Sequence, residues 1–488
     1  MLPANCHIGL PALKSRRDDT LLTVDFNLRE TGNMRILQNC RPCGTLSKSV
    51  ASVVRRLKST VNRVPSLRDW LQVFSLKVFS LKVLFGLPAV PSLRDWLSAN
   101  RRITIHRIIL CLIVLILIVL SLIGCQKEQD YKQTQPRRSV LVYLGVDNNL
   151  HSEAEQKISQ LKKTWNKDID GNLFVYSDTG EQPFLVNIYY TPQRGAVTDT
   201  ISIHPNLNSA LPATLAGAMN AVRAFRNADS FGLVVLSHGT GWLPAEMSTP
   251  AIRPKSIILD ASTDQTENYM EIATFADAIP YRLDFIIFDA CWMASVEAAY
   301  QLKDKTDYIV ASSAEILEPG FVYGSMMQHL FKPAPDLKAV AREFYEYHNA
   351  APDIFRSATV SVIKTSELPA LRELAKDISQ QAPIDAETFL PLETLDNIQH
   401  FGHGAHRLFF DLGDYLRALA PDRSNDVDAA LERSVPYRAS TPQYYSSATG
   451  ALEPIKAFSG LTVYIPQEAY PKTNDAHQNL RWTKDFFH

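Results

Sequence analysis

Two apolar runs of strand length stand out along the chain, and each ends at a group of small or polar residues. Residues 233–236 read LVVL and residues 285–288 read FIIF, with no polar position in either run. Runs that are apolar on both faces are typical of strands in a parallel sheet that helices cover on both sides. Each strand is predicted to present one reactive side chain just past its carboxyl end, His238 after the first and Cys291 after the second.

The same alternation of apolar runs and helical spacing extends over the middle of the chain. Strands are predicted at 139–144, 173–176, 185–190, 231–236, 257–259, 285–288 and 308–311, and helices at 153–165, 208–226, 268–278 and 295–302. Strands that alternate with helices favour an α/β fold of three layers. After Ser366 the pattern changes to helices with a late strand-like piece at 461–465. We therefore predict a catalytic core at 139–366, and at 367–488 either a C-terminal subdomain or an extension of the core.

Charge is divided unevenly along the chain. Residues 1–124 carry 18 Lys and Arg against 6 Asp and Glu, whereas the remainder carries 32 against 45. The overall composition, 46% hydrophobic and 21% charged, is ordinary for a soluble globular protein. An acidic body disfavours a nucleic-acid partner and is compatible with a cationic substrate.

A targeting signal lies at the boundary between the basic and the acidic part. Arg101, Arg102 and Arg107 precede an apolar run at 108–123, which is short for a membrane span and typical of a signal-peptide core. The run ends in Leu-Ile-Gly-Cys at 122–125, which resembles the lipobox of bacterial lipoproteins. The resemblance implies a signal peptide at 101–124, cleavage before Cys125 and a lipid on its thiol. A plain membrane anchor with an incidental cysteine is the alternative.

The segments on either side of this signal are predicted to lack a packed fold. Residues 125–138 form a polar tether that resembles those of surface-exposed lipoproteins, which implies an outer-membrane location and exposure at the cell surface. Residues 64–71 (VPSLRDWL) recur at 90–97, and FSLKV at 74–78 recurs at 79–83. Exact repeats this short, with no solenoid period, do not indicate a packed domain. We interpret 1–100 as a segment upstream of the true start site.

The cysteine count sharpens the chemistry of the body. The six cysteines are Cys6, Cys40, Cys43, Cys111, Cys125 and Cys291. Cleavage and lipidation at Cys125 would leave Cys291 as the one thiol, so no internal disulfide is available. A neighbouring imidazolium stabilises a thiolate and later protonates a leaving amine. His238 and Cys291 are therefore predicted to form a nucleophilic dyad; the alternatives are a structural histidine and a cysteine that only fills the core.

The glycines beside His238 indicate where the developing charge is stabilised. Gly239 and Gly241 have no side chain, so a substrate can approach their backbone closely. We predict that the N–H groups of Gly239 and Cys291 form the oxyanion hole. Ser237 is not expected to act as a nucleophile with His238 as its base, because adjacent strand residues point to opposite faces of the sheet.

Ser-His-Gly-Thr-Gly-Trp at 237–242 and Asp-Ala-Cys-Trp-Met at 289–293 resemble the histidine and cysteine motifs of clostripain-like cysteine peptidases, in the caspase–gingipain–legumain group. Segments 146–150, 318–320 and 458–466 also resemble parts of that family. The resemblance implies a caspase-like α/β/α sandwich with a mostly parallel sheet, a dyad of His238 and Cys291, and cleavage after Arg or Lys. A catalytically silent surface lipoprotein that binds peptides or glycans is the alternative.

Some members of that family depend on calcium. For this chain, a dependence on calcium is implied by the resemblance alone. The sequence shows no acidic calcium loop, and no cofactor is predicted to be required. His400, His403 and His406 lie three residues apart, but no carboxylate or cysteine completes a recognisable ligand set. We therefore predict no metal site.

Basic specificity requires a carboxylate in the substrate pocket. Asp289 matches the acidic residue that the family carries two positions before its nucleophile, and Glu315 and Glu318 lie in the loop after the next predicted strand. All three are candidate substrate-binding residues. The alternative for Asp289 is that it only hydrogen-bonds the loop backbone.

The long insert at 243–256 separates the two catalytic strands. Exposed loops are preferred sites of proteolytic nicking, and this insert contains Arg253 and Lys255. Because a proline follows Arg253, the bond after Lys255 is the better candidate for self-processing, as occurs in related peptidases. An ordinary surface loop is the alternative.

Overall fold

The computed structural model describes residues 138–180, 182–203, 207–244, 257–260, 269–381, 389–402 and 406–484. The predictions for the upstream segment 1–100, the signal peptide 101–124, Cys125 with most of the tether, Lys255 and His403 therefore lie outside the described residues. Within the described part, no helix has the length and apolar character needed to cross a membrane.

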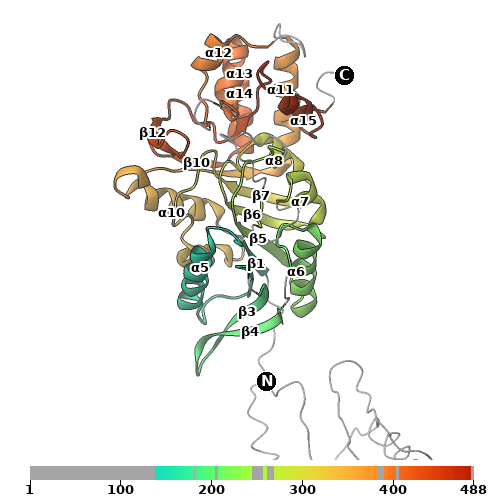
Figure 1. Cartoon of the computed structure of the whole chain (residues 1–488), viewed down its shortest axis with the longest axis vertical. Helices are drawn as coiled ribbons and strands as arrows, with labels where there is room; N and C mark the ends of the chain where they lie inside the picture. Colours follow the sequence, from blue (N-terminus) through green and yellow to red (C-terminus); the bar gives the residue numbers. More distant parts are fainter. Residues whose placement is uncertain are drawn as a thin grey trace, which may run out of the picture. The chain divides into compact units, whose positions relative to one another are not determined.

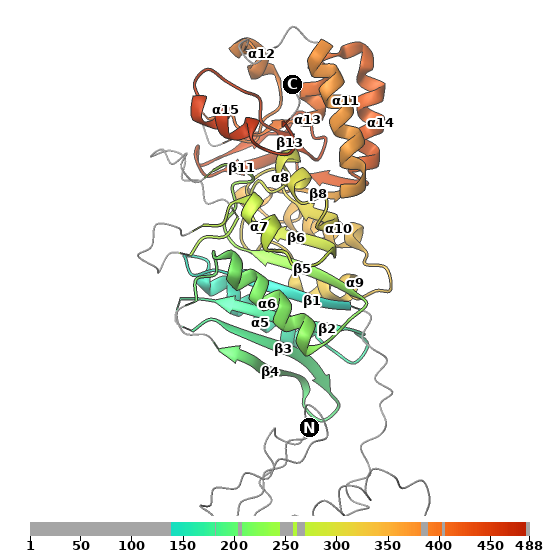
Figure 2. The ribbon, with the colours of Figure 1, turned by 90° about the vertical axis from the view of Figure 1, so that its right-hand side faces the viewer.

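The described residues contain a nine-stranded sheet at the centre of the fold (Figures 1 and 2). Its strand order is β10-β8-β7-β6-β5-β1-β2-β3-β4. The strands are β1 (Arg138–Gly145), β2 (Asn172–Asp178), β3 (Phe184–Thr191), β4 (Gly195–Ile203), β5 (Ser230–Leu236), β6 (Leu283–Asp289), β7 (Thr306–Ala311), β8 (Thr359–Lys364) and β10 (Tyr437–Ser440). The five central strands from β7 to β2 are parallel, and the strands at both edges pair antiparallel.

Helices cover both faces of this sheet (Figure 1). On one face lie α5 (His151–Thr164), α9 (Tyr323–Leu330) and α10 (Leu337–Asn349), and on the other lie α6 (Pro212–Phe225), α7 (Ile272–Ala278) and α8 (Val296–Gln301). Strand β1 shows how the sequence specifies two cores. Val140 and Val142 pack into the core under α5, whereas Leu141 and Tyr143 pack into the core under α6. Successive strand residues point to opposite faces, so a continuous apolar run supplies both cores. The predicted three-layer α/β fold is confirmed.

The chain after residue 366 packs on the α8 end of this core. It contains α11 (Leu368–Gln381), α12 (Leu392–Asn397), α13 (Leu412–Leu419), α14 (Ser424–Ser434) and α15 (Pro471–Gln478), with the short strands β9 (Phe410–Asp411), β11 (Gln443–Ser446), β12 (Ala451–Pro454) and β13 (Thr462–Val463). Strand β10 from this segment extends the main sheet beside β8. Glu297 on α8 accepts a hydrogen bond from Tyr464 N–H at 2.7 Å and lies 3.3 Å from the ring of His477. Residues of this segment, such as Val463 and Tyr464, therefore belong to the same hydrophobic core as Val296 and Ala298 of α8.

Most predicted elements match observed ones, but one predicted strand is nearly absent, and β4, β8, α9 and α10 had no predicted counterpart. The predicted strand at 257–259 is reduced to a single bridge between Leu259 and Tyr269. Strand β4 was not predicted, although Val197, Thr198 and Thr200 have strand-forming side chains. It lies at the edge of the sheet and carries no continuous apolar run, so the signal that identified the central strands is weak there.

Candidate active site

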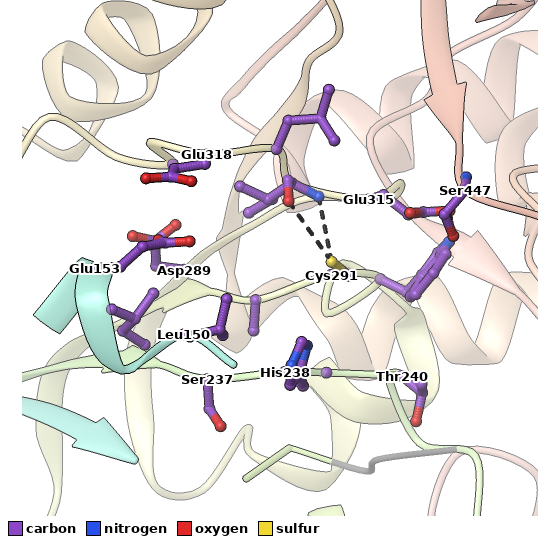
Figure 3. A pocket seen from close by; sticks show the side chains of 17 residues that line it. Leu150, Glu153, Ser237, His238, Thr240, Asp289, Cys291, Glu315, Glu318 and Ser447 are labelled. Atoms are coloured by element: carbon purple, nitrogen blue, oxygen red, sulfur yellow. Dashed lines mark hydrogen bonds between the residues drawn. The ribbon is translucent and has the colours of Figure 1, made fainter. Parts of the chain in front are cut away.

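The sheet places the predicted histidine and cysteine side by side. Strands β5 and β6 are parallel neighbours, and their register pairs Leu236 with Asp289. His238 and Cys291 each stand two residues beyond this pair. Neighbouring strands lie about 4.8 Å apart. Because the two residues have the same offset on adjacent strands, both side chains emerge at the same edge of the sheet (Figure 3).

The loop that carries Cys291 is fixed by the loop that follows β7. The N–H of Trp292 donates to the carbonyl of Ala314 at 3.1 Å, and the N–H of Ala294 donates to Ser312 at 2.9 Å. Ser295 then caps α8, because its hydroxyl accepts the N–H of Ala298 at 3.3 Å. Cys291 therefore stands in a short, hydrogen-bonded turn between a buried strand and a helix.

The loop that carries His238 is pressed against the cysteine loop, and glycine makes this possible. A Cβ atom on Gly239 would lie 2.8 Å from the carbonyl oxygen of Cys291, and one on Gly241 would lie 2.9 Å from that of Trp292. Gly241 also has a φ of +63°, in the region that favours glycine. Side chains at these positions would push the two loops apart.

Both predicted catalytic residues line one cavity of about 480 Å³. Among its lining residues are Leu150, Glu153, Ser237, His238, Gly239, Asp289, Cys291, Glu315, Ile316, Glu318 and Ser447 (Figure 3). The structure therefore brings His238, Gly239, Cys291 and the three predicted substrate-binding carboxylates to a single space. Such a cavity with convergent polar groups is the usual form of an active site.

Each member of the pair also contacts a second residue. Nε2 of His238 lies 2.8 Å from the amide oxygen of Asn149, which precedes α5. A carbonyl oxygen can only accept, so Nε2 carries the proton in this contact and leaves Nδ1 as the basic nitrogen. Sγ of Cys291 accepts the N–H of Ile316 at 3.3 Å and lies 3.9 Å from the carbonyl of the same residue. The loop after β7 thus also positions the sulfur atom.

Three carboxylates gather at one end of the cavity, which we call the acidic end: Glu153, Asp289 and Glu318 (Figure 3). They come from the first turn of α5, the last residue of β6 and the loop after β7. Burial raises the pKa of Glu153 to about 7, with smaller contributions from the charges of Asp289 and Glu318. Lys157 opposes this shift. The acidic end thus holds more negative than positive charge.

Asp289 is tied into the protein at this end. Its Oδ2 lies 3.5 Å from Nζ of Lys157, and both side chains are buried. Its two oxygens accept the N–H of Phe321 at 3.3 and 3.4 Å. Burial raises the pKa of Asp289, whereas Lys157 and the N–H of Phe321 lower it. Lys157 also donates to the carbonyls of Pro319 and Phe321. Asp289 therefore lines the cavity while bonding the loop backbone, which was the alternative considered for it.

Glu315 lies on the other side of the cysteine. Its Oε1 accepts the backbone N–H of Ser447 at 2.9 Å and its hydroxyl at 3.0 Å. Burial raises the pKa of Glu315, and the bonds from Ser447 partly offset this. The contact attaches the turn between β11 and β12 to the loop after β7, so this carboxylate links the C-terminal segment to the cavity wall.

Sequence reasoning gave no role to Asn149, Glu153 or Lys157. A signal for the last two exists, because a glutamate four residues before a lysine places both on one side of a helix. Which side faces the cavity depends on how α5 packs across the sheet.

Among the described residues, no group of three or more His, Cys, Asp or Glu side chains could hold a metal ion.

The fold and this cavity define a cysteine-peptidase type of site on a caspase-like sheet. The model of the clostripain family matches residues 142–469, and the chain belongs to that family. The clostripain of Hathewaya histolytica is 22% identical over 230 residues, which cover 41% of this chain. The matched region spans only 43% of that relative's length.

Solved structures agree with this assignment. An inactive zymogen of a C11 protease from Parabacteroides distasonis is 32% identical, with a TM-score of 0.64, covering 73% of this chain and 99% of that one. A secreted C11 cysteine protease from Bacteroides thetaiotaomicron is 25% identical, with a TM-score of 0.63, covering 73% and 100%. A structure of a secreted C11 cysteine protease from Bacteroides thetaiotaomicron in complex with an irreversible peptide inhibitor is 25% identical, with a TM-score of 0.59, covering 71% of this chain and 97% of that one. The chain is thus a member of a family of cysteine peptidases.

Proposed function

We propose that this chain is a lipid-anchored endopeptidase that cleaves after Arg or Lys, with Cys291 as nucleophile and His238 as acid and base. The observation that carries the proposal is the equal offset of the two residues beyond paired positions of β5 and β6, above a cavity that both line. A nucleophile and a base held within reach of each other in a cavity are the minimum that thiol chemistry requires.

The reaction follows from these positions. His238 takes the thiol proton, and Sγ of Cys291 attacks the carbonyl carbon of the scissile bond. The oxygen that becomes negative lies toward the N–H groups of Gly239 and Cys291, which stabilise the tetrahedral intermediate. His238 then protonates the leaving amine, and an acyl group remains on Cys291. Water, deprotonated by His238, attacks this acyl group and releases the acid product.

The acidic end supports a basic residue before the cleaved bond. A substrate whose carbonyl lies beside Cys291 can extend its preceding side chain toward Glu153 and Glu318. Guanidinium and ammonium groups bind carboxylates in such a partly buried space more strongly than in water. No step of the mechanism requires calcium, and comparison of turnover with and without a chelator tests the dependence that family resemblance allows.

The experiment that tests the proposal is cleavage of a diverse peptide library by the purified protein, with Cys291→Ala as the variant. We expect Arg or Lys before most cuts, and a loss of turnover of at least about a thousandfold in the variant. Ser366→Ala is the control, because it removes one small polar side chain that is exposed and does not line the cavity. Binding of peptides or glycans without turnover would favour the silent lipoprotein instead.

The anchor and the processing site are further parts of this proposal. We propose that a lipid on Cys125 holds the peptidase at the outer membrane, exposed at the cell surface. A fatty-acid probe should label the protein but not Cys125→Ala, and protease treatment of intact cells separates a surface from a periplasmic position.

We also propose a self-processing cut after Lys255. Mass spectrometry of active protein should find a new terminus at Ser256, which Lys255→Ala removes.

A further inference from the structure

The charges at the acidic end are unequally balanced. Lys157 is the positive group that contacts Asp289, and it also donates to two carbonyl groups of the loop after β7. These bonds occupy its three N–H donors within the protein. Lys157 therefore interacts with Asp289 and the loop backbone. The carboxylates that remain for a substrate at the acidic end are those of Glu153 and Glu318.

Glu153, unlike Asp289, forms no ion pair with Lys157. It stands one helical turn before Lys157, half-buried, and it lines the cavity together with Cys291. Among the described residues, its carboxylate and that of Glu318 have no hydrogen bond or ion pair. Glu318 is exposed and well hydrated, whereas Glu153 is partly removed from water. The partly buried carboxylate gains most from an incoming cation, because the local dielectric constant is lower.

We propose that Glu153 is the specificity-determining residue that recognises the positive charge before the scissile bond, and that substrate binding is coupled to loss of its proton. This inference rests on the proposed function and deepens it. When Glu153 is ionised, the acidic end carries two negative charges beyond the neutral pair of Lys157 and Asp289. A bound guanidinium or ammonium group then offsets one of them, and the proton released by Glu153 goes to solvent.

The sign of the resulting pH dependence follows from the free enzyme. With a pKa of about 7, Glu153 is mostly protonated at pH 6 and mostly ionised at pH 8. A bound cation lowers this pKa, so affinity for a basic side chain rises as pH increases through 7. The groups that face Glu153 are Lys157, Asp289, Glu318 and Tyr323. The pKa of Tyr323 is raised well above its usual value, so Tyr323 stays neutral throughout this range.

The test compares two peptides that differ only before the cleaved bond, one with Arg and one with the neutral isostere citrulline. The ratio of their kcat/KM values is measured from pH 5.5 to 8.5 with the full chain, so that titration of the catalytic pair cancels. For the unmodified protein we expect the ratio to rise about tenfold between pH 6 and 8. In Glu153→Gln the ratio should be at least about tenfold lower at pH 8 and independent of pH.

Glu155→Gln is the matched control, because Glu155 is exposed on the same helix and the charge change is identical. In Glu155→Gln the ratio of the two kcat/KM values should increase with pH as in the unmodified protein. In Glu153→Asp, which retains the charge, the ratio should also increase with pH. If Glu153→Gln retains both the ratio and its pH dependence, the inference is wrong although cleavage after Arg still stands. Equal loss of both peptides in Glu153→Gln would show a structural role and also overturn it. If the unmodified protein does not prefer Arg, the basic preference itself fails.

Discussion

The two ends of the active-site cavity are held in place by different parts of the fold. His238 and Cys291 follow adjacent parallel strands at the same offset, so the register of the sheet alone brings them together. The acidic end takes one residue each from α5, β6 and the loop after β7. These segments belong to different layers, and their relative position depends on packing across the sheet. If the proposed function holds, strand register positions the catalytic pair, whereas packing between layers positions the residues that select the substrate.

The same contrast applies to the interactions that stabilise each end. At the catalytic end, backbone approaches backbone, and Gly239 allows the approach. At the acidic end, a buried ion pair between Lys157 and Asp289 joins the helix to the strand and the loop. Variants that remove one of these devices while leaving the other intact should separate the two functions.

The largest effect is expected from Lys157→Met, which removes the positive partner of a buried carboxylate. Unpairing a buried charge costs about 3–5 kcal/mol, so the free energy of unfolding should fall by about this amount at pH 8. The folded-state pKa of Asp289 is raised already and rises further without Lys157. Protonation relieves the cost at low pH, so the deficit should be smaller at pH 5 than at pH 8. Urea unfolding at both pH values measures this.

Lys163→Met is the control for that measurement, because Lys163 is exposed on the same helix. We expect it to change the free energy of unfolding by no more than about 0.5 kcal/mol. The double variant Lys157→Met, Asp289→Asn should recover part of the lost stability. A double variant no more stable than Lys157→Met would show that the buried charge is not what Lys157 compensates.

A second variant, Gly239→Ala, acts on the catalytic end. The added Cβ would lie 2.8 Å from the carbonyl of Cys291 and 3.1 Å from the Cβ of Ala290, so the backbone has to shift. Displacing one oxyanion-hole donor lowers kcat by about 10²–10³-fold. Steady-state kinetics should show this loss in kcat, with KM and the preference for Arg nearly unchanged.

Gly217→Ala provides the matched comparison, since Gly217 lies in α6 and a Cβ there meets no atom within 4 Å. It should leave kcat unchanged and raise the stability by about 0.5–1 kcal/mol, as expected for alanine in a helix. Normal kcat in Gly239→Ala would mean that the N–H of Gly239 takes no part in stabilising the oxyanion.

The contrast also explains what could be predicted from the sequence. The strands β5 and β6 and the positions of His238 and Cys291 just past their carboxyl ends were predicted from local apolar runs and the residues that end them. That the two strands are neighbours in the sheet became known only from the structure. Glu153 and Lys157 could not be assigned in this way, because their side chains reach the cavity only through the placement of α5 against the sheet. The roles of Asp289 and Glu315 likewise depend on partners far away in sequence, Lys157 and Ser447.

The smallest effect is expected from Asn149→Ala, at the point where the α5 layer contacts the catalytic end. Asn149 accepts a hydrogen bond from Nε2 of His238 at 2.8 Å, and we expect this contact to hold the ring in the orientation that catalysis requires. Loss of one hydrogen bond to a group that becomes charged costs about 1.5 kcal/mol, or about tenfold in kcat. Asn149 is a positioning residue, so a change in the pH profile should accompany the loss in rate.

Asn149→Asp distinguishes positioning from simple packing. A carboxylate restores the acceptor and, being negative, raises the pKa of the imidazolium. Protonated His238 cannot take the thiol proton, so the acid limb of kcat/KM should move to higher pH. Asn479→Ala, an exposed position on the C-terminal segment, is the control and should leave the profile unchanged. If Asn149→Asp shows the same pH profile as the unmodified protein, the contact does not act through His238. The strand register alone would then orient the catalytic pair, and the division between the two ends of the cavity would be complete.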